Sequence, residues 1–376
     1  MDCQGLFFIS ESEISMYFFL LSLITFYMVC LLTNNFFLNF LSFTLVVLRF
    51  LFFYVWSFIL FFIFFELSSI PVILITLIYG VQVEKFNAIY YLVFYRFLTG
   101  LPFLVILLYL IRENYFFGLV FFECKLSSFY CLLVVLCFLI KFPVYFLHFW
   151  LPKMHVEAST LASILLAGLL LKFGVYGFYR VLYILKFEYL GLFFTVAFIG
   201  IFIGIFIRIV QRDIKRQVAY SSVCHIGFTL LSFFYFSEIS LERVILSSLR
   251  HGFLRTLIFW LAGEIYYQRG TRLVYYIESE ASRRIYNALF QGVTLLISSS
   301  IPLVLGYFSE YGLLYLVEMY EFFYYLFVLY FFLDFYISVY LFTITFSGKG
   351  FKAGFLFLLR AALGFLIINL SFYSFQ

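Results

Sequence analysis

Six ionisable residues lie within long apolar stretches of the 376-residue sequence: Glu66, Lys141, Lys172, His225, His251 and Glu310. A charge at the centre of a bilayer costs at least about 2.5–3.5 kcal/mol, so residues of this kind usually serve a function. Burial helps a lysine to release its proton, a nearby carboxylate opposes that release, and histidine titrates near neutral pH. This combination predicts a proton path, and the alternative is a set of fixed internal salt bridges.

The elements that must position these residues are apolar helices. Hydrophobic residues make up 66% of the chain and charged residues 11%, and the mean hydropathy is +1.11. A soluble domain averages about half apolar and about a quarter charged residues. These values exclude a soluble enzyme, a disordered chain and a disulfide scaffold, and they predict an all-α polytopic membrane protein. We expect about twelve transmembrane helices, at 14–33, 36–53, 55–79, 86–111, 127–150, 156–182, 187–209, 214–236, 242–266, 286–318, 321–346 and 352–372.

Two of these spans look broken. Pro143 closely follows Lys141 in one span, and Pro302 follows three serines in the other. Proline removes a helical hydrogen bond, and a break within lipid persists only where it faces protein or water. Because the breaks fall at matching positions of two five-helix sets, we predict inverted repeats with discontinuous helices, and two unrelated kinks are the alternative. The predicted organisation is a single domain, 1–376, with repeats at about 36–182 and 187–346 and an additional C-terminal helix at 352–372.

The loop charges predict an orientation. Cytoplasmic or matrix loops carry an excess of lysine and arginine. One set of alternate loops is assigned Lys85, Lys153, Arg208, Arg212, Lys215, Arg216, Arg269, Arg272, Arg283, Arg284, Lys349 and Lys352, and the other is assigned Arg112, Lys125, Arg180, Lys186 and Arg243. We therefore expect the first set to face the matrix or cytoplasm, and both termini to lie on the opposite side.

Further charged residues fall inside or near the spans. Arg49, Arg96, Arg250 and Arg255 could pair with carboxylates or line a hydrated core, and Asp334 lies in the middle of its span. The sequence alone does not choose between these two interpretations.

The composition also suggests where the gene resides. The chain contains 60 Phe and 32 Tyr, more than membrane packing requires, which suggests the T-rich codon bias common in organelle genomes. Acidic residues precede the first apolar span and the first basic residue is Arg49, a pattern unlike a secretory signal or a transit peptide. We therefore expect a protein encoded and made in an organelle.

Several segments resemble the chain 4 family of NADH:ubiquinone oxidoreductase, an antiporter-like membrane subunit of respiratory complex I. The most specific segment, Lys141–Arg180, reads KFPVYFLHFWLPKMHVEASTLASILLAGLLLKFGVYGFYR. Further matching segments are FFELSSIPVILITLIYG at 64–80, RDIKRQVAYSSVCHIGF at 212–228, HGFLRTLIFWLAGEIY at 251–266 and IPLVLGYFSEYGLL at 301–314. The resemblance extends from about residue 55 to 346.

The resemblance implies a role for each of the six residues. Glu66 matches the glutamate that pairs with the lysine of the broken helix, and Lys141 matches that lysine. Lys172 matches the lysine of the next helix, and the two histidines match members of a central hydrophilic axis. Glu310 matches the terminal carboxylate at the second broken helix.

The chain also departs from this family. Members usually have fourteen helices, and by this resemblance we expect two of them to be absent before residue 14. Ser159 stands where the family usually has proline, and Arg250 and Arg255 flank His251 where small or neutral residues are usual.

The implied function is proton translocation in the membrane arm of complex I, as a subunit of an enzyme whose redox chemistry takes place elsewhere. NADH, FMN, iron–sulfur clusters and ubiquinone are then expected in partner subunits. No cofactor or metal is expected in this chain, because its six cysteines show no cluster spacing and no GxGxxG motif follows a strand. The expected partners are other membrane-arm subunits, including sister antiporter-like chains, and membrane lipids, with no nucleic acid.

The expected location is the mitochondrial inner membrane, crossed many times, with both termini on the intermembrane-space side. Two other functions stay open at this point. The chain could be a subunit of a free-standing cation/proton antiporter, or a structural membrane subunit with an inactive channel.

Overall fold

The computed structural model describes residues 3–55, 57–112, 128–185, 190–233, 238–274, 292–295, 297–299, 309–310 and 321–346. Its named elements, all helical, are α1 (Cys3–Leu32), α2 (Phe36–Tyr54), α3 (Phe58–Leu67), α4 (Ser69–Tyr79), α5 (Lys85–Arg112), α6 (Ser128–Lys141), α7 (Trp150–Glu157), α8 (Thr160–Leu165), the π-helix η1 (Leu166–Leu170), α9 (Leu171–Leu185), α10 (Leu190–Val210), α11 (Ile214–Phe233), α12 (Glu238–Arg269) and α15 (Glu321–Phe346). The predicted break at Pro302 and the predicted helix at 352–372 lie outside the described residues.

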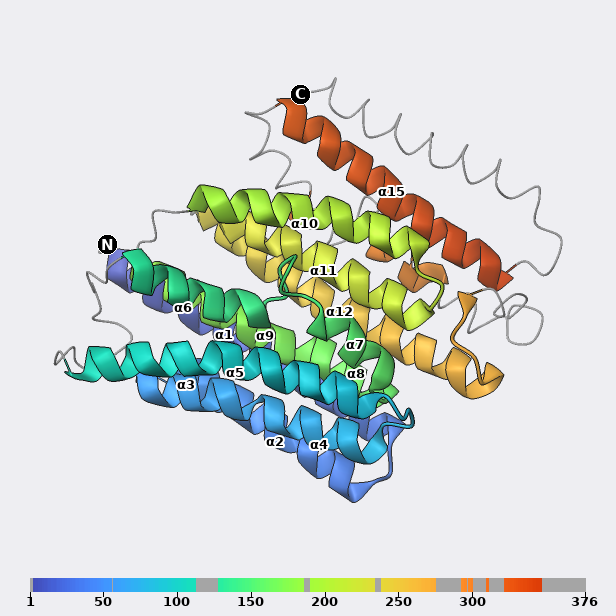
Figure 1. Cartoon of the computed structure of the whole chain (residues 1–376), viewed down its shortest axis with the longest axis horizontal. Coiled ribbons are helices and arrows are strands. Elements are labelled where there is room, and N and C mark those ends of the chain that lie inside the picture. The colour runs from blue at the N-terminus through green and yellow to red at the C-terminus, as the bar shows by residue number, and fades with distance from the viewer. Residues whose placement is uncertain are drawn as a thin grey trace. The chain divides into compact units, whose positions relative to one another are not determined.

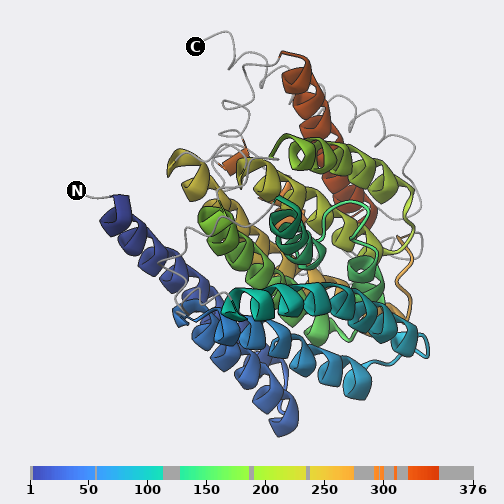
Figure 2. The same cartoon turned by 60° about the vertical axis from the view of Figure 1, so that its left-hand side comes forward.

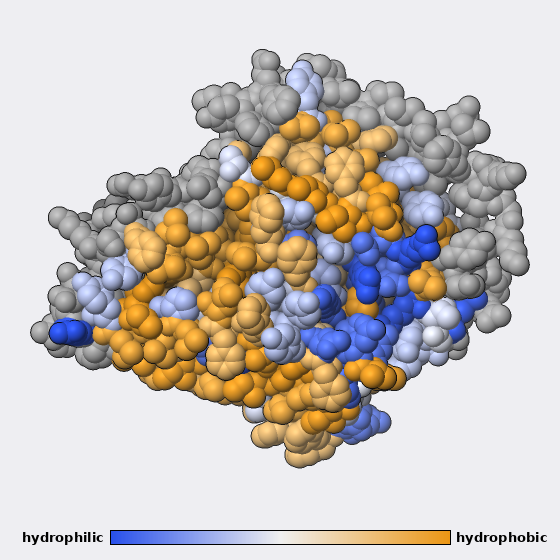
Figure 3. Space-filling model, viewed as in Figure 1, coloured by the Kyte–Doolittle hydropathy of each residue, from blue (hydrophilic) through white to orange (hydrophobic). Residues whose placement is uncertain are grey.

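Seven helical segments in the described ranges are long and apolar enough to cross a membrane: Ile14–Leu32, Phe36–Tyr54, Phe58–Tyr79, Lys85–Tyr109, Thr160–Arg180, Arg243–Tyr267 and Tyr324–Ile344. Each coincides with one of the twelve predicted spans. Apolar side chains cover much of the face shown in Figure 3, as expected for a surface in contact with lipid. The polytopic helical fold is therefore confirmed, whereas the full count of twelve stays a prediction.

Internal contacts divide the chain into two compact units, and each is described separately below. The first comprises residues 1–197 and 251–256, and the second comprises 198–250 and 257–376. In the first unit α5 packs against α6, α6 packs against α9, and α1 packs against α2. The helices α2 to α5, blue to cyan in Figure 1 and Figure 2, lie side by side.

Aromatic side chains form the centre of the first unit. Phe52 of α2 stacks on Phe61 of α3 with ring centroids 4.5 Å apart, and its ring lies 4.9 Å from that of Phe173 in α9. Phe65 of α3 lies 4.9 Å from Phe138 of α6. These five rings are almost fully buried. The abundance of phenylalanine thus has a structural use here, because broad rings fill the space where four helices meet.

The second unit brings α10, α11 and α15 together. Phe228 of α11 and Phe198 of α10 both contact Phe327 of α15, with ring centroids 5.4 and 5.3 Å apart. Arg208 of α10 forms an ion pair with Asp334 of α15, and both side chains are only 4% exposed. This pair accounts for the otherwise costly position of Asp334 in the middle of an apolar helix.

At least three residues assigned to loops by the charge count are buried side chains within helices: Arg180, Arg208 and Lys215 of α11. Arg208 lies inside α10 in the pair described above. Arg180 lies inside α9 and donates hydrogen bonds to the carbonyls of Val55 and Phe53, at 2.7 and 3.1 Å. Their assignment to loops is therefore wrong, because the position of a charge near the end of a span does not reveal whether its side chain faces water or a buried partner.

Candidate functional site

The helix that carries Glu66 is interrupted two residues after it, at Ser68. Helix α3 ends at Leu67 and α4 begins at Ser69, with Ser68 forming a turn between them. Pro71 has no N–H to donate to the carbonyl of Leu67, and its ring crowds that carbonyl. The predicted span at 55–79 is therefore two helices in series. Pro71 is the sequence signal that could have revealed this interruption.

The predicted break at Lys141 is confirmed. Lys141 is the last residue of α6, and the chain leaves helical geometry until Trp150 begins α7. Phe146, within this connection, adopts a φ of 74°. The indole Nε1 of Trp150 donates to the carbonyl of Ile140 at 3.0 Å and so anchors the start of α7 to the end of α6. The break leaves the lysine side chain at a helix end inside the apolar bundle.

A third irregularity precedes Lys172. The π-helix η1 ends at Leu170, two residues before it. π-Bulges of this kind are rare and often occur at functional sites. Upstream, the side chain of Ser159 accepts a hydrogen bond from the N–H of Ala162 at 3.3 Å and caps α8. Serine is a preferred N-cap residue, which explains how this chain begins the helix where the resembling family usually has proline.

Glu66, Arg96 and Lys141 form a largely buried ionic triad, which we call the first-unit triad. The Nζ of Lys141 lies 2.9 Å from Oε1 of Glu66, and the Nε of Arg96 lies 2.6 Å from Oε2. The same Nζ donates to the carbonyl of Phe65 at 2.9 Å and lies 3.1 Å from the centre of its ring. The side chains are only 11–20% exposed. Each carboxylate oxygen thus has its own cation, brought from a different helix.

A small cavity adjoins the first-unit triad. The cavity has a volume of about 30 Å³, enough for roughly two water molecules. Arg96 and Lys141 contribute to its wall together with Ser68, Tyr95 and Phe173. The cavity therefore offers room and polar partners for water directly beside the lysine.

Lys172 and His251 form a second buried pair in the first unit. The Nζ of Lys172 lies 2.9 Å from Nδ1 of His251, and both residues are almost completely buried. The positive charges of Arg49 and Arg255 also act on this lysine. Arg49 is fully buried and donates to the carbonyl of Gly168 in the π-helix at 3.4 Å. Two titratable groups in direct contact can exchange a proton, and the nearby arginines disfavour further positive charge.

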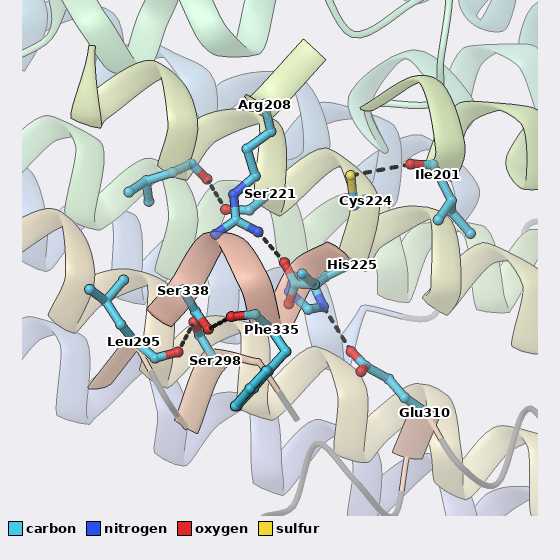
Figure 4. Close-up of polar contacts among 12 residues, drawn as sticks. Ile201, Arg208, Ser221, Cys224, His225, Leu295, Ser298, Glu310, Phe335 and Ser338 are labelled. Atoms are coloured by element: carbon cyan, nitrogen blue, oxygen red, sulfur yellow. Dashed lines mark hydrogen bonds and ion pairs between the residues drawn. The ribbon is translucent and has the colours of Figure 1, made fainter. Parts of the chain in front are cut away.

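In the second unit His225 and Glu310 are in contact. The Nδ1 of His225 lies 2.8 Å from Oε1 of Glu310, and Figure 4 shows the histidine side chain directed at this carboxylate. Arg250 of α12 also binds Oε1 and donates a second hydrogen bond to the carbonyl of Ser298 at 2.6 Å. This group, which we call the second-unit triad, again joins a carboxylate to one arginine and one titratable base.

The structure thus arranges the six predicted residues in three contacting pairs: Glu66 with Lys141, Lys172 with His251, and His225 with Glu310. Sequence reasoning named Arg96 and Arg250 only as possible partners, and each in fact binds one of the two carboxylates. Their positions within apolar stretches were the available signal. Among the described residues, no cluster of three or more His, Cys, Asp or Glu side chains could hold a metal ion.

Comparisons with known proteins show the family. A family described as "NADH:quinone oxidoreductase/Mrp antiporter, TM" matches residues 56–338. The chain is 38% identical to NADH-ubiquinone oxidoreductase chain 4 of Ascaris suum, over 78% of this chain and 71% of that protein. It is 36% identical to the protein of the same name from Caenorhabditis elegans, over 77% of this chain and 70% of that one.

Solved structures share the fold. A chain of respiratory complex I from Thermus thermophilus with bound NADH superimposes with a TM-score of 0.79 at 24% identity, covering 93% of this chain and 79% of that chain. A chain of the Mrp complex from Dietzia sp. DQ12-45-1b gives a TM-score of 0.81 at 18% identity, covering 90% of this chain and 66% of that chain. At these identities the likeness concerns the fold alone.

Proposed function

This chain belongs to the NADH:quinone oxidoreductase/Mrp antiporter membrane family, and within it to the NADH-ubiquinone oxidoreductase chain 4 proteins, and from that premise we propose that it is a proton-translocating membrane-arm subunit of respiratory complex I. Its enzymatic role is that of a subunit of the H⁺-translocating NADH:ubiquinone reductase, in the mitochondrial inner membrane. Redox cofactors belong to partner subunits, and this chain moves protons.

The observation that carries this proposal is the first-unit triad at the end of a broken helix. Lys141 is held between a carboxylate and a cavity that has room for water. A lysine in contact with Glu66 retains its proton, and a lysine that turns from the carboxylate toward water can release it. A small displacement of the Lys141 side chain would therefore switch this site between holding and passing a proton.

The remaining parts of the path follow from the other pairs. We assign proton transfer to Lys172 with His251 and to His225 with Glu310, because each pair holds two titratable groups in contact. Water is expected to connect the groups, since isolated buried charges are too costly unless they are paired or hydrated. Inverted repeats at about 36–182 and 187–346, with both termini on the intermembrane-space side, remain part of the proposal.

The test is the substitution Lys141→Ala in the complete complex. The geometry of the break after Lys141 depends on Pro143 and on the hydrogen bond of Trp150 to Ile140, so the chain should still assemble. NADH-driven proton uptake in membrane vesicles should fall by about 10²-fold, the lower end of what a positioned proton-transfer group contributes. Lys153→Ala is the matched control, because Lys153 is exposed and lies against the ring of Tyr91. Normal proton uptake in an assembled Lys141→Ala complex would refute the assignment.

Purification distinguishes the alternative of a free-standing cation/proton antiporter. A complex I subunit should co-purify in mild detergent with NADH-oxidising activity and many membrane-arm partners. A free antiporter subunit would migrate with a few partners and without NADH oxidation.

A further inference from the structure

Arg96 is a member of the first-unit triad for which the proposed proton path has no role. It lies on α5, and its Nε approaches Oε2 of Glu66 at 2.6 Å while Lys141 binds the other carboxylate oxygen. The Arg96 side chain is 17% exposed, so this contact is largely shielded from solvent. The two cations therefore share one buried carboxylate without competing for the same atom.

The two cations differ in chemistry. A guanidinium stays protonated throughout the physiological pH range, whereas a buried lysine gains and loses its proton readily. We propose that Arg96 is a positioning residue that acts as a permanent counter-ion, keeping Glu66 ionised and fixed in place while Lys141 changes its protonation state. This inference rests on the proposed function, and it makes Lys141, rather than Glu66, the proton carrier of the triad.

The charge balance gives the reason. With Lys141 protonated, two cations and one carboxylate give the triad a net charge of +1. When the Nζ–H bond breaks, its electron pair stays on nitrogen, the proton passes to water in the adjoining cavity, and a neutral Arg96–Glu66 pair remains. Without Arg96, the same step would leave an unpaired buried carboxylate, which is costly. Arg96 thus removes the charge penalty for proton release.

The surroundings of Lys141 support this account. Among the described residues, the charged and titratable groups that face it are Glu66 from α3, Arg96 and Tyr95 from α5, and Cys137 from its own helix. The parts of α4 and α9 that line the cavity are uncharged. Glu66 and Arg96 are therefore the groups that set the charge balance at this lysine.

The second-unit triad repeats the combination independently. Arg250 and His225 both contact Oε1 of Glu310, so this carboxylate too meets a permanently charged arginine and a titratable base. The hydrogen bond from the Arg250 side chain to the backbone carbonyl of Ser298 fixes the guanidinium in this position. If each arginine served only to hold two helices together, neither triad would need a titratable base beside its carboxylate.

The test uses three variants of the assembled complex and the pH profile of NADH-driven proton uptake. Arg96→Gln should move the profile to higher pH, by about 1 unit or more, because Glu66 then holds the Lys141 proton unopposed. Glu66→Gln should move it to lower pH, because two cations then repel each other. The double variant restores the native net charge, so its profile should return close to that of the wild type.

A purely structural role for Arg96 predicts a different pattern. Loss of packing would reduce assembly or rate, add up in the double variant and leave the pH profile in place, and this result would overturn the proposal. Arg180→Gln is the matched control, because Arg180 is a buried arginine of the same unit that donates to the carbonyls of Phe53 and Val55. Its substitution should not shift the profile.

Two results separate this proposal from the proposed function. Unchanged proton uptake in Lys141→Ala would refute the function of the whole site. Lost uptake in Lys141→Ala, together with a native pH profile in Arg96→Gln, would overturn only the role of Arg96. If Arg96→Gln does not assemble, the double variant decides, because a displaced profile in that variant contradicts the charge balance.

Discussion

The buried ion pair between Arg208 and Asp334 allows a quantitative test of how charge is tolerated inside the second unit. The two side chains are each 4% exposed, and the pair joins α10 to α15. Replacing one partner by an apolar residue leaves the other charge buried without its counter-ion. Breaking a buried pair in this way costs about 3–5 kcal/mol, which changes the equilibrium between folded and unfolded chain by at least about 10²-fold.

Removing both charges should have a much smaller effect. Replacement of a buried pair by well-packed apolar residues is neutral or stabilising by about 1–4 kcal/mol. We therefore expect Arg208→Met and Asp334→Leu each to lower the thermal stability of the assembled chain strongly. The double variant should be as stable as the wild type or more so.

The assay is thermal loss of the assembled chain in detergent, measured for the wild type, both single variants and the double variant. Proton uptake per assembled complex serves as the control, and it should stay unchanged because neither residue belongs to the proposed path. Single variants as stable as the wild type would contradict burial of the pair. A double variant as unstable as the single variants would attribute the cost to packing rather than to charge.

The remaining predictions concern the first unit. Glu66→Gln keeps the shape of the side chain but removes its charge, so proton uptake should fall while assembly persists, and full-rate uptake would reduce its ion pair to a structural role. Lys172→Met should retain assembly, because it removes a buried cation beside two arginines, yet uptake should be lost; retained uptake would show that contact with His251 is not needed. Gly177→Ala would place a Cβ 2.6 Å from the ring of Phe138, so thermal stability should fall by about 1–3 kcal/mol, and an unchanged melting temperature would refute this close approach.

The family resemblance and the local sequence together predicted much of the site. Apolar runs identified the seven spans that the structure describes, because hydropathy over about twenty residues is enough to specify a membrane helix. Pro143 located the break beside Lys141, because proline lacks the N–H that would continue the helix and crowds the preceding turn. The six ionisable residues stood out because a charge in an apolar run is costly in any fold that spans the membrane.

The pairing of charges was decided only by the tertiary structure. Glu66 lies 30 residues from Arg96 and 75 from Lys141 in the sequence, and Glu310 lies 85 residues from His225. Which cation contacts which carboxylate depends on how each helix is rotated and packed, and the sequence of one helix does not reveal either. For the same reason Arg208 resembled a loop charge in the sequence, although the packing of α10 against α15 makes it half of a buried ion pair.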